Sequence, residues 1–257
     1  MHFISALQPL FDQLWWLLPL LVFAGVVKTA WFKGFFGELL VRLSARFLLD
    51  SNEYRAIHNV TLKTPDGTTQ IDHVFVSRFG IFVVETKNYS GWIFGEENQA
   101  MWTQKLFKTT RKFQNPLRQN LKHIKALESL VGLPSETFHS VIVFVGGSEF
   151  KTKMPQNVTY AGGYISCIKS KTSPILSASE VETVYSAISS GRLAPSLATN
   201  REHIKNVQNR LDHNASRLCP KCGAEMVKRT VKSGDKAGSQ FWGCSAFPKC
   251  RTIQNIT

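Results

Sequence analysis

Apolar residues form one long run near the start of the chain. Nothing between Gln13 and Val27 is charged, and the side chain of Lys28 can snorkel, which extends the run by a further turn. About 20 helical residues cross ~30 Å of hydrocarbon. Aromatic rings, which prefer the membrane interface, lie near both ends: Trp15, Trp16 and Trp31. We therefore expect residues 1–34 to form a single transmembrane anchor.

Two other interpretations of this run are a cleaved signal peptide and a buried helix of a soluble domain. A signal peptide needs a basic n-region and a small-x-small cleavage site, and neither is present. Asp12 is the only charged side chain before the run, whereas the residues after it are basic: Lys28, Lys33, Arg42 and Arg46. The positive-inside rule then predicts a single-pass protein of a bacterial-type inner membrane, with its soluble domains facing the cytoplasm.

The pattern behind the anchor alternates between strands and helices. Helical spacing is found over residues 37–49, 115–131 and 177–190, and strand-like stretches over 56–62, 70–88, 91–104 and 140–147. Asn115 and Pro116 suit the start of the central helix, Gly132 suits its end, and Ser179 is the expected cap of the last helix. This order predicts an α/β domain, residues 35–190, with a mixed sheet flanked by helices.

The last quarter of the chain differs in composition. Residues 191–217 are polar and predict a linker with one exposed helix, followed by a small module over 218–257. The chain holds 31 Lys and Arg against 18 Asp and Glu, a net charge of +13. From Arg201 onward there are 11 basic and 4 acidic residues, so this quarter carries seven of the thirteen charges. Such a surplus either solubilises the surface or binds a polyanionic partner, which is nucleic acid or an anionic membrane face.

The stretch QIDHVFVSRFGIFVVETK, residues 70–87, is strongly strand-forming, yet it carries three charged residues near its ends. A two-residue loop at its centre would pair Asp72 with Glu85 and Gln70 with Lys87, all on one face. Two carboxylates placed ~5 Å apart repel each other unless a cation lies between them. That cation is either a divalent metal such as Mg²⁺, held by Asp72 and Glu85, or Lys87 in a structural ion pair.

The order of these residues is similar to that in the PD-(D/E)xK nuclease superfamily. The segments FGELLV, GTTQIDHVFVSRFGIFVVETKNYSGWIFG and NPLRQNLKHIKAL together resemble the nuclease-related domain called NERD, over residues 35–145. The resemblance implies a restriction-endonuclease-like fold. It implies Asp72 and Glu85 as ligands of a catalytic Mg²⁺ or Mn²⁺, and Lys87 as the catalytic lysine.

The resemblance also implies roles for residues outside the hairpin. Glu38 is the supporting acid from the first helix, and Gln119 is the polar residue on the helix after the sheet, with His123 one turn further on the same side. One departure is that the first acid stands in IDH rather than in a Pro-Asp pair. On the same helix Arg118 and Lys122 either track phosphates of a nucleic acid or form a solvated face.

Four of the five cysteines gather near the C-terminus: Cys219, Cys222, Cys244 and Cys250. The first two are separated by two residues and the last two by five, with 21 residues between the pairs. Four thiolates close a tetrahedral structural Zn²⁺ site, and a module this small needs the metal in order to fold. The alternative, two disulfides, is disfavoured in a reducing compartment.

The segments CPKCGAEMVKR and QFWGCSAFPKC resemble the zinc domain at the C-terminus of type I bacterial topoisomerases, which binds single-stranded DNA. The residues expected to stack on bases or pair with phosphates are Lys228, Arg229, Lys232, Phe241, Trp242, Phe247, Lys249 and Arg251. Some of these rings must fill the module's small core instead. A complete topoisomerase is not expected, because no domain here is large enough and no tyrosine lies in a recognisable cleavage motif.

Taken together, these features predict a membrane-tethered protein with a nuclease-like domain and a DNA-binding zinc ribbon. Two classes of function are compatible with the sequence. In the first, the protein hydrolyses phosphodiesters with Mg²⁺ or Mn²⁺ while the ribbon holds DNA. In the second, the same fold binds and tethers DNA without cleaving it. An RNA-directed version of either is a third interpretation.

Overall fold

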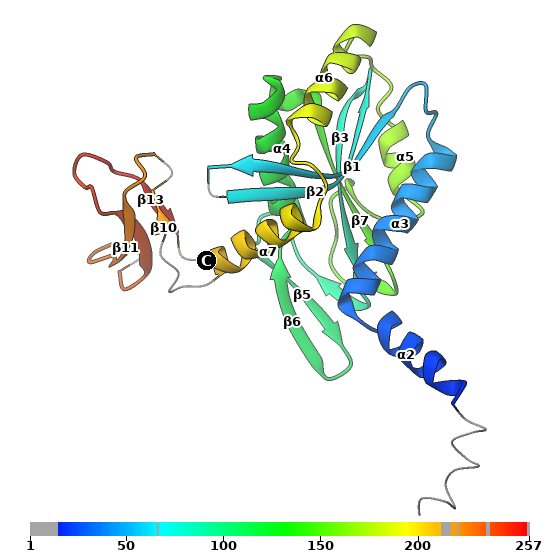
Figure 1. Ribbon diagram of the computed structural model, residues 1–257, viewed down its shortest axis with the longest axis horizontal. Helices are drawn as coiled ribbons and strands as arrows, with labels where there is room; N and C mark the ends of the chain where they lie inside the picture. The colour runs from blue at the N-terminus through cyan, green and yellow to red at the C-terminus, as the bar shows by residue number, and fades with distance from the viewer. Residues whose placement is uncertain (1–14, 66, 212–216, 220, 235–236, 256–257) are drawn as a thin grey trace, which may run out of the picture.

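A computed structural model of the protein describes residues 15–65, 67–211, 217–219, 221–234 and 237–255 (Figure 1). The larger domain is built around a five-stranded mixed sheet of order β1-β2-β3-β7-β9. Its strands are β1 (Arg55–Thr64), β2 (Gly67–Ser77), β3 (Gly80–Asn88), β7 (Phe138–Val145) and β9 (Val158–Tyr160). The first three run antiparallel to one another, whereas β7 and β9 are parallel to β3. The expectation of a mixed sheet is confirmed.

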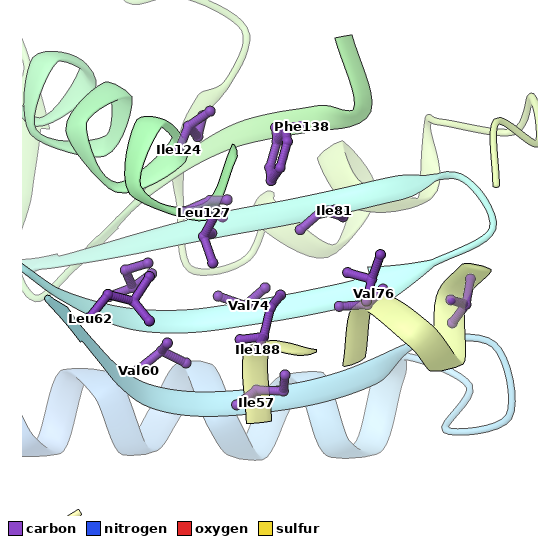
Figure 2. Packing of buried hydrophobic residues seen from close by; sticks show 14 of the residues in the cluster. Ile57, Val60, Leu62, Val74, Val76, Ile81, Ile124, Leu127, Phe138 and Ile188 are labelled. Carbon is purple, nitrogen blue, oxygen red and sulfur yellow. The ribbon is translucent and has the colours of Figure 1, made fainter. Parts of the chain in front are cut away.

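Helices cover both faces of this sheet. On one face α4 (Pro116–Val131) and α6 (Ala178–Gly191) pack against inward-facing residues of the first three strands, as Figure 2 shows for Ile124 and Leu127. On the other face α3 (Ala30–Leu48) and α5 (Tyr164–Lys169) bury Phe75, Phe82 and Val84. The central strands are therefore covered on both sides, which explains why their sequence is apolar at nearly every position.

The start of α4 follows from its sequence. Asn115 caps the helix by accepting from the N–H of Leu117, Pro116 occupies the first turn, and Gly132 ends the helix in the left-handed conformation, all as expected. Helix α6 differs from expectation in its cap. Its N-cap is Ser177 rather than Ser179, because Ser177 forms a reciprocal capping box with Glu180.

A second, smaller sheet of order β6-β5-β4-β8 lies beside the central one. Its strands are β4 (Gly91–Phe94), β5 (Met101–Leu106), β6 (Thr109–Gln114) and β8 (Ser148–Phe150). Trp102 on β5 is fully buried and packs with Phe144 of the central sheet. The two sheets therefore share a core. A short 3-10 turn, η1 (Ser135–Thr137), precedes β7.

The N-terminal apolar run is broken rather than continuous. Helix α2 (Leu17–Val27) ends before Lys28, and Thr29 starts α3 by accepting a hydrogen bond from the N–H of Phe32. Among the described residues, no single helix is long and apolar enough to cross a membrane. The bent pair of α2 and residues 31–48 of α3 passes by length and composition, with an angle of 72° between its helices. Residues 1–14 of the expected anchor lie outside the described residues.

The segment expected to be a linker contains α7 (Leu197–Leu211), which packs on the far end of the β1–β2 hairpin. Both His203 and Asn206 contact the Thr68 hydroxyl, at 3.0 and 3.2 Å. The C-terminal module is a small antiparallel sheet, whose strands are β10 (Arg217–Leu218), β11 (Glu225–Thr230), β12 (Gln240–Cys244) and β13 (Ile253–Asn255). The exposed helix of the expected linker is thus attached to the larger domain.

Candidate nuclease site and zinc centre

The candidate nuclease site lies where strands β2 and β3 separate. Their ladder runs from Ser77–Gly80 to His73–Val84, which confirms the predicted two-residue loop. The predicted pairs Asp72–Glu85 and Gln70–Lys87 are not part of that ladder. Beyond His73, β2 continues against β1 alone, while β3 continues against β7 as far as Asn88.

The carboxylate of Asp72 bridges this point of separation. Its Oδ2 accepts a hydrogen bond of 2.8 Å from the backbone N–H of Thr86. On the other side of β2, Asn59 has a φ of 53° and does not pair with Asp72, although His58–His73 and Val60–Ile71 on either side of it do. The irregular position in β1 thus lies opposite Asp72. On the other side, no main-chain pair joins Asp72 to β3, and its side chain makes the connection to β3 through Thr86 instead.

Glu85 and Lys87 lie two residues apart on β3 and form a buried ion pair. Lys87 Nζ donates to Glu85 Oε1 at 2.6 Å and to Gln119 Oε1 on α4 at 2.8 Å. The side chain of Glu85 is 3% exposed and that of Lys87 16%. The structural ion pair considered from the sequence is therefore present, and Gln119 joins it from the predicted helix.

His123 also lies beside the ion pair of Lys87 and Glu85. The sequence predicted its position on the helix but no role for it. Its Nε2 lies 3.2 Å from Glu85 Oε2, outside hydrogen-bond geometry, and its Nδ1 lies 2.9 Å from the Thr69 hydroxyl. Gln119 and His123 are four residues apart and share one face of α4. The i, i+4 spacing was the signal for His123, whereas nothing in the sequence singled out Thr69.

The electrostatics of the site depend on three neighbouring carboxylates. Burial raises the pKa of Asp72 well above its usual range, and the charges of Glu85 and Glu38 raise it further against the opposing Thr86 N–H and Lys87. Burial would also raise the pKa of Glu85, but Lys87 and His123 outweigh it and lower that pKa to about 2. Without a metal, Asp72 therefore holds a proton more readily than Glu85 does.

The charge of Glu85 affects the pKa of both Glu38 and Lys87. Burial raises the pKa of Glu38, with Arg42 opposing the rise and Glu85 adding to it. Burial lowers the pKa of Lys87, but the ion pair with Glu85 outweighs burial and the net effect is a raised pKa. Glu38, on α3, is thus electrostatically coupled to the hairpin acids Asp72 and Glu85.

The residues present fit a divalent metal of the Mg²⁺ type. Glu85 Oε2 is buried and has no hydrogen-bond partner among the described residues, although His123 Nε2 lies 3.2 Å from it. The pKa of Asp72 is raised first by burial and then by the charges of Glu85 and Glu38, and a cation would relieve the effect of those charges. Among the described residues, only the four cysteines form a group of three or more ligand atoms within 4.8 Å of one another. Two carboxylates suit Mg²⁺, which keeps several of its waters when bound.

The predicted basic contacts near this site are exposed. Lys122 points from α4 toward solvent, and Arg118 is also exposed but donates to the backbone carbonyl of Asn98. Arg118 thereby fixes the loop between β4 and β5, so that its guanidinium is partly engaged. Both remain available to a phosphate backbone on the outer face of α4.

The zinc centre is formed by the four predicted cysteines. Their sulfur atoms all lie within 4.8 Å of one another, with Cys219 Sγ 3.6 Å from Cys250 Sγ and Cys222 Sγ 3.4 Å from Cys244 Sγ. Zn–S bonds of ~2.3 Å in a tetrahedron place sulfurs roughly 3.8 Å apart, so the spacing fits Zn²⁺. All four are free thiols without a disulfide.

The aromatic residues of the module separate into core and surface. Trp242 is 5% exposed and packs with Met226 and the cysteines, so its predicted stacking on DNA is not supported by its position. Phe247 is 55% exposed, with the Arg229 guanidinium 5.6 Å from its ring centroid, and Phe241 is half-buried. The remaining predicted contacts are exposed cations: Lys228, Lys232, Lys249 and Arg251.

Comparison with known proteins identifies the families of both domains. Residues 33–145 match the nuclease-related domain, NERD, and residues 216–257 match the topoisomerase DNA-binding C4 zinc finger. The uncharacterized protein pXO1-01 of Bacillus anthracis is 39% identical over 185 residues, which cover 69% of this chain and 85% of that protein. No solved structure matches the chain. The chain belongs to the NERD family, and its nuclease-related domain is followed by a topoisomerase-type C4 zinc ribbon.

Proposed function

We propose that this protein is a membrane-anchored, metal-dependent nuclease that acts on DNA. The observation that carries the proposal is the junction of β2 and β3, where Asp72, Glu85 and Lys87 meet with one carboxylate oxygen of Glu85 free of hydrogen bonds. Asp72 and Glu85 would hold Mg²⁺ or Mn²⁺. When bound, such a metal activates a water molecule and stabilises the charge that develops on a phosphodiester.

The side chains around the carboxylates would set the geometry of the reaction. Gln119 and Glu85 hold Lys87 Nζ from two directions, which keeps its charge positioned for a phosphoryl oxygen. His123, held by Thr69, lies against the second oxygen of Glu85 and restricts its rotation. Glu38 raises the negative charge of the site and so would favour a divalent cation over a monovalent one.

The zinc ribbon would supply DNA binding, with a preference for single strands. Its exposed Phe247 and nearby Arg229 combine a stacking surface with a cation, the pairing that sequence-tolerant single-strand binding uses. The apolar pair of α2 and α3 would anchor the chain in a bacterial-type inner membrane, with both domains on the cytoplasmic side.

A second candidate is a DNA tether that does not cleave. The direct ion pair between Lys87 and Glu85 favours it, because the lysine already has a buried anionic partner. The two candidates make different predictions for metal binding. A nuclease should bind Mn²⁺ at the hairpin and lose that site on Asp72→Asn, whereas a site closed by its own ion pair should bind no metal there.

The decisive experiment is cleavage of labelled single- and double-stranded DNA and RNA by the zinc-loaded full chain in detergent, with Mg²⁺ or Mn²⁺. Asp72→Ala and Lys87→Ala should each remove cleavage, while Glu136→Gln, an exposed acid on η1, should not. Cleavage that persists in both variants would place the chemistry elsewhere. Binding without cleavage by the parent chain in either metal would support the tether.

A further inference from the structure

Helix α3 has two apolar faces, and only one of them packs against the domain. Its inner face repeats every four residues and is buried: Gly37, Val41 and Ala45. Its outer face carries residues 36, 40, 43 and 47, which we call the outer stripe. They are 45, 41, 40 and 78% exposed, in the order Phe36, Leu40, Leu43 and Phe47.

The outer stripe is continuous rather than scattered. Spacings of four, three and four residues place side chains one above another on a helix, so the stripe covers roughly 16 Å of its length. Single exposed apolar residues are normal on protein surfaces, but a contiguous apolar band marks a contact surface. A domain helix of an ordinary soluble protein would carry polar residues at these four positions.

The composition of the neighbouring chain indicates what covers the stripe. Helix α2, directly before α3, is apolar on all sides, and none of its described residues is buried. Exposed apolar surface therefore continues from α2 through Trp31 and Phe35 to the outer stripe. A surface of this extent beside an all-apolar helix is typical of contact with lipid.

The charges on α3 fit a lipid surface as well. Glu38 is the only acidic residue of α3 and belongs to the nuclease site, whereas Lys33 and Arg46 are exposed beside the stripe. Basic residues flanking an apolar helical face suit an interface with anionic headgroups. A protein partner with an apolar groove would have no need of this basic border.

We propose that the outer stripe of α3 is a membrane contact, so that the nuclease-related domain lies on the bilayer along α3 instead of hanging from α2. The bend of 72° between the helices allows α2 to enter the membrane while α3 runs close to its surface. The inference rests on the membrane anchor proposed above. Because Glu38 is on the same helix, this membrane contact would place the nuclease site within about one helix diameter, ~10–12 Å, of the lipid.

The test measures the depth of single positions in the zinc-loaded full chain, reconstituted in vesicles of phosphatidylglycerol and phosphatidylcholine. Cys167→Ala removes the cysteine outside the zinc centre, and a nitroxide label is attached to Phe47→Cys, Leu21→Cys or Phe107→Cys, one at a time. These three positions are 78, 67 and 93% exposed. Oxygen concentrates in lipid and a nickel chelate in water, so the ratio of their collision rates with the label reports depth.

The label at 47 is expected to collide more with oxygen than with the nickel chelate, like the label at 21 in α2 and unlike the label at 107 in the β5–β6 loop. Position 47 lies 16 residues beyond Trp31, ~24 Å along the helix, so its insertion does not follow from the anchor alone. Circular dichroism of each labelled chain confirms that the fold is retained.

Three results would overturn the inference, and they are distinguishable. A label at 47 in water with the label at 21 in lipid leaves the anchor intact but removes the contact of α3. Labels at 21 and 47 that are both in water remove the proposed anchor as well. Dipolar broadening between labels at 47 shows that a second copy covers the stripe instead of lipid.

Discussion

The nuclease-related domain and the zinc ribbon differ in where their candidate metal ligands lie relative to the hydrophobic core. In the larger domain two separate apolar clusters cover the faces of the sheet, and the carboxylates are added at a point where two strands part. In the ribbon, three of the four metal ligands are themselves the core: Cys219, Cys244 and Cys250 are buried with Met226 and Trp242. The carboxylates proposed to hold a metal are thus an addition to one fold, whereas the zinc ligands are a component of the other.

The comparison is tested most strongly by removing zinc. Chelation, or Cys244→Ser, should unfold the ribbon and leave the larger domain folded, because structural zinc contributes about 10–16 kcal/mol in small modules. Amide dispersion in NMR spectra should collapse for residues 217–255 alone. Loss of dispersion in both domains would mean that they fold as one unit.

The buried ion pair of the larger domain should give the next largest effect. Glu85→Gln leaves Lys87 buried without its carboxylate, and breaking such a pair costs about 3–5 kcal/mol. Denaturant melts should show this loss in the nuclease-related domain and no change in the ribbon. Glu149→Gln, which breaks the exposed ion pair with Lys151, is the matched control and should cost less than about 1 kcal/mol.

The surface of the ribbon should affect binding without affecting folding. Phe247→Ala should weaken binding of a short single-stranded DNA by about 1–3 kcal/mol, the contribution of one stacked base, and leave zinc content unchanged. Fluorescence anisotropy of labelled oligonucleotides measures the change. Phe107→Ala, which removes an even more exposed ring on the other domain, serves as control, and equal losses in both variants would contradict a specific role of the ribbon.

The smallest predicted effect is that Asp72→Asn stabilises the metal-free domain while removing a proposed metal ligand. The pKa of Asp72 is raised in the folded state, so its contribution to stability is present below about pH 3.8 and is lost as pH rises through the raised pKa. Asp72→Asn removes the buried carboxylate charge, and the amide oxygen of the new side chain can still accept the hydrogen bond from the Thr86 N–H. The variant should therefore stabilise the metal-free domain by about 0.5–2 kcal/mol at neutral pH.

The same variant should lose its response to metal. In the parent chain, Mn²⁺ at a hundred times its dissociation constant should add about 2.7 kcal/mol of stability, and this increment should vanish in Asp72→Asn. Thermal melts with and without Mn²⁺ separate the two effects. A parent chain that melts at the same temperature under both conditions would leave the hairpin without a metal.

Much of this organisation could be predicted from local sequence. The two-residue loop of the β2–β3 hairpin, the start and end of α4 and the four-cysteine cluster all follow from turn residues, caps and ligand spacing. These features depend on neighbours in the chain. The position of Gln119 on the helix after the sheet followed from a resemblance, whereas its hydrogen bond from Lys87 was not predicted.

What could not be predicted depends on contacts between distant segments. Strand β2 separates from β3 beside Asp72, opposite the irregular position Asn59 in the preceding strand. The sequence prediction extended a regular β2–β3 ladder past this point and therefore gave wrong partners for Asp72 and Gln70. The break at Thr29 interrupts a run that hydrophobicity alone treats as continuous. Trp242 is buried by a core that forms only when the cysteines meet.

The attachment of α7 to Thr68 limits how far the ribbon can travel. Six peptide units separate Leu211 at the end of α7 from Arg217 at the start of β10, a reach of at most roughly 21 Å. A DNA strand bound to the ribbon, as proposed, would then be confined to a small volume beside the β1–β2 hairpin. Short tethers give effective concentrations in the millimolar range. If it cleaves DNA as proposed, the nuclease-related domain would need only weak affinity of its own for DNA, and its turnover would depend on the DNA that the ribbon holds nearby rather than on the concentration of DNA in solution.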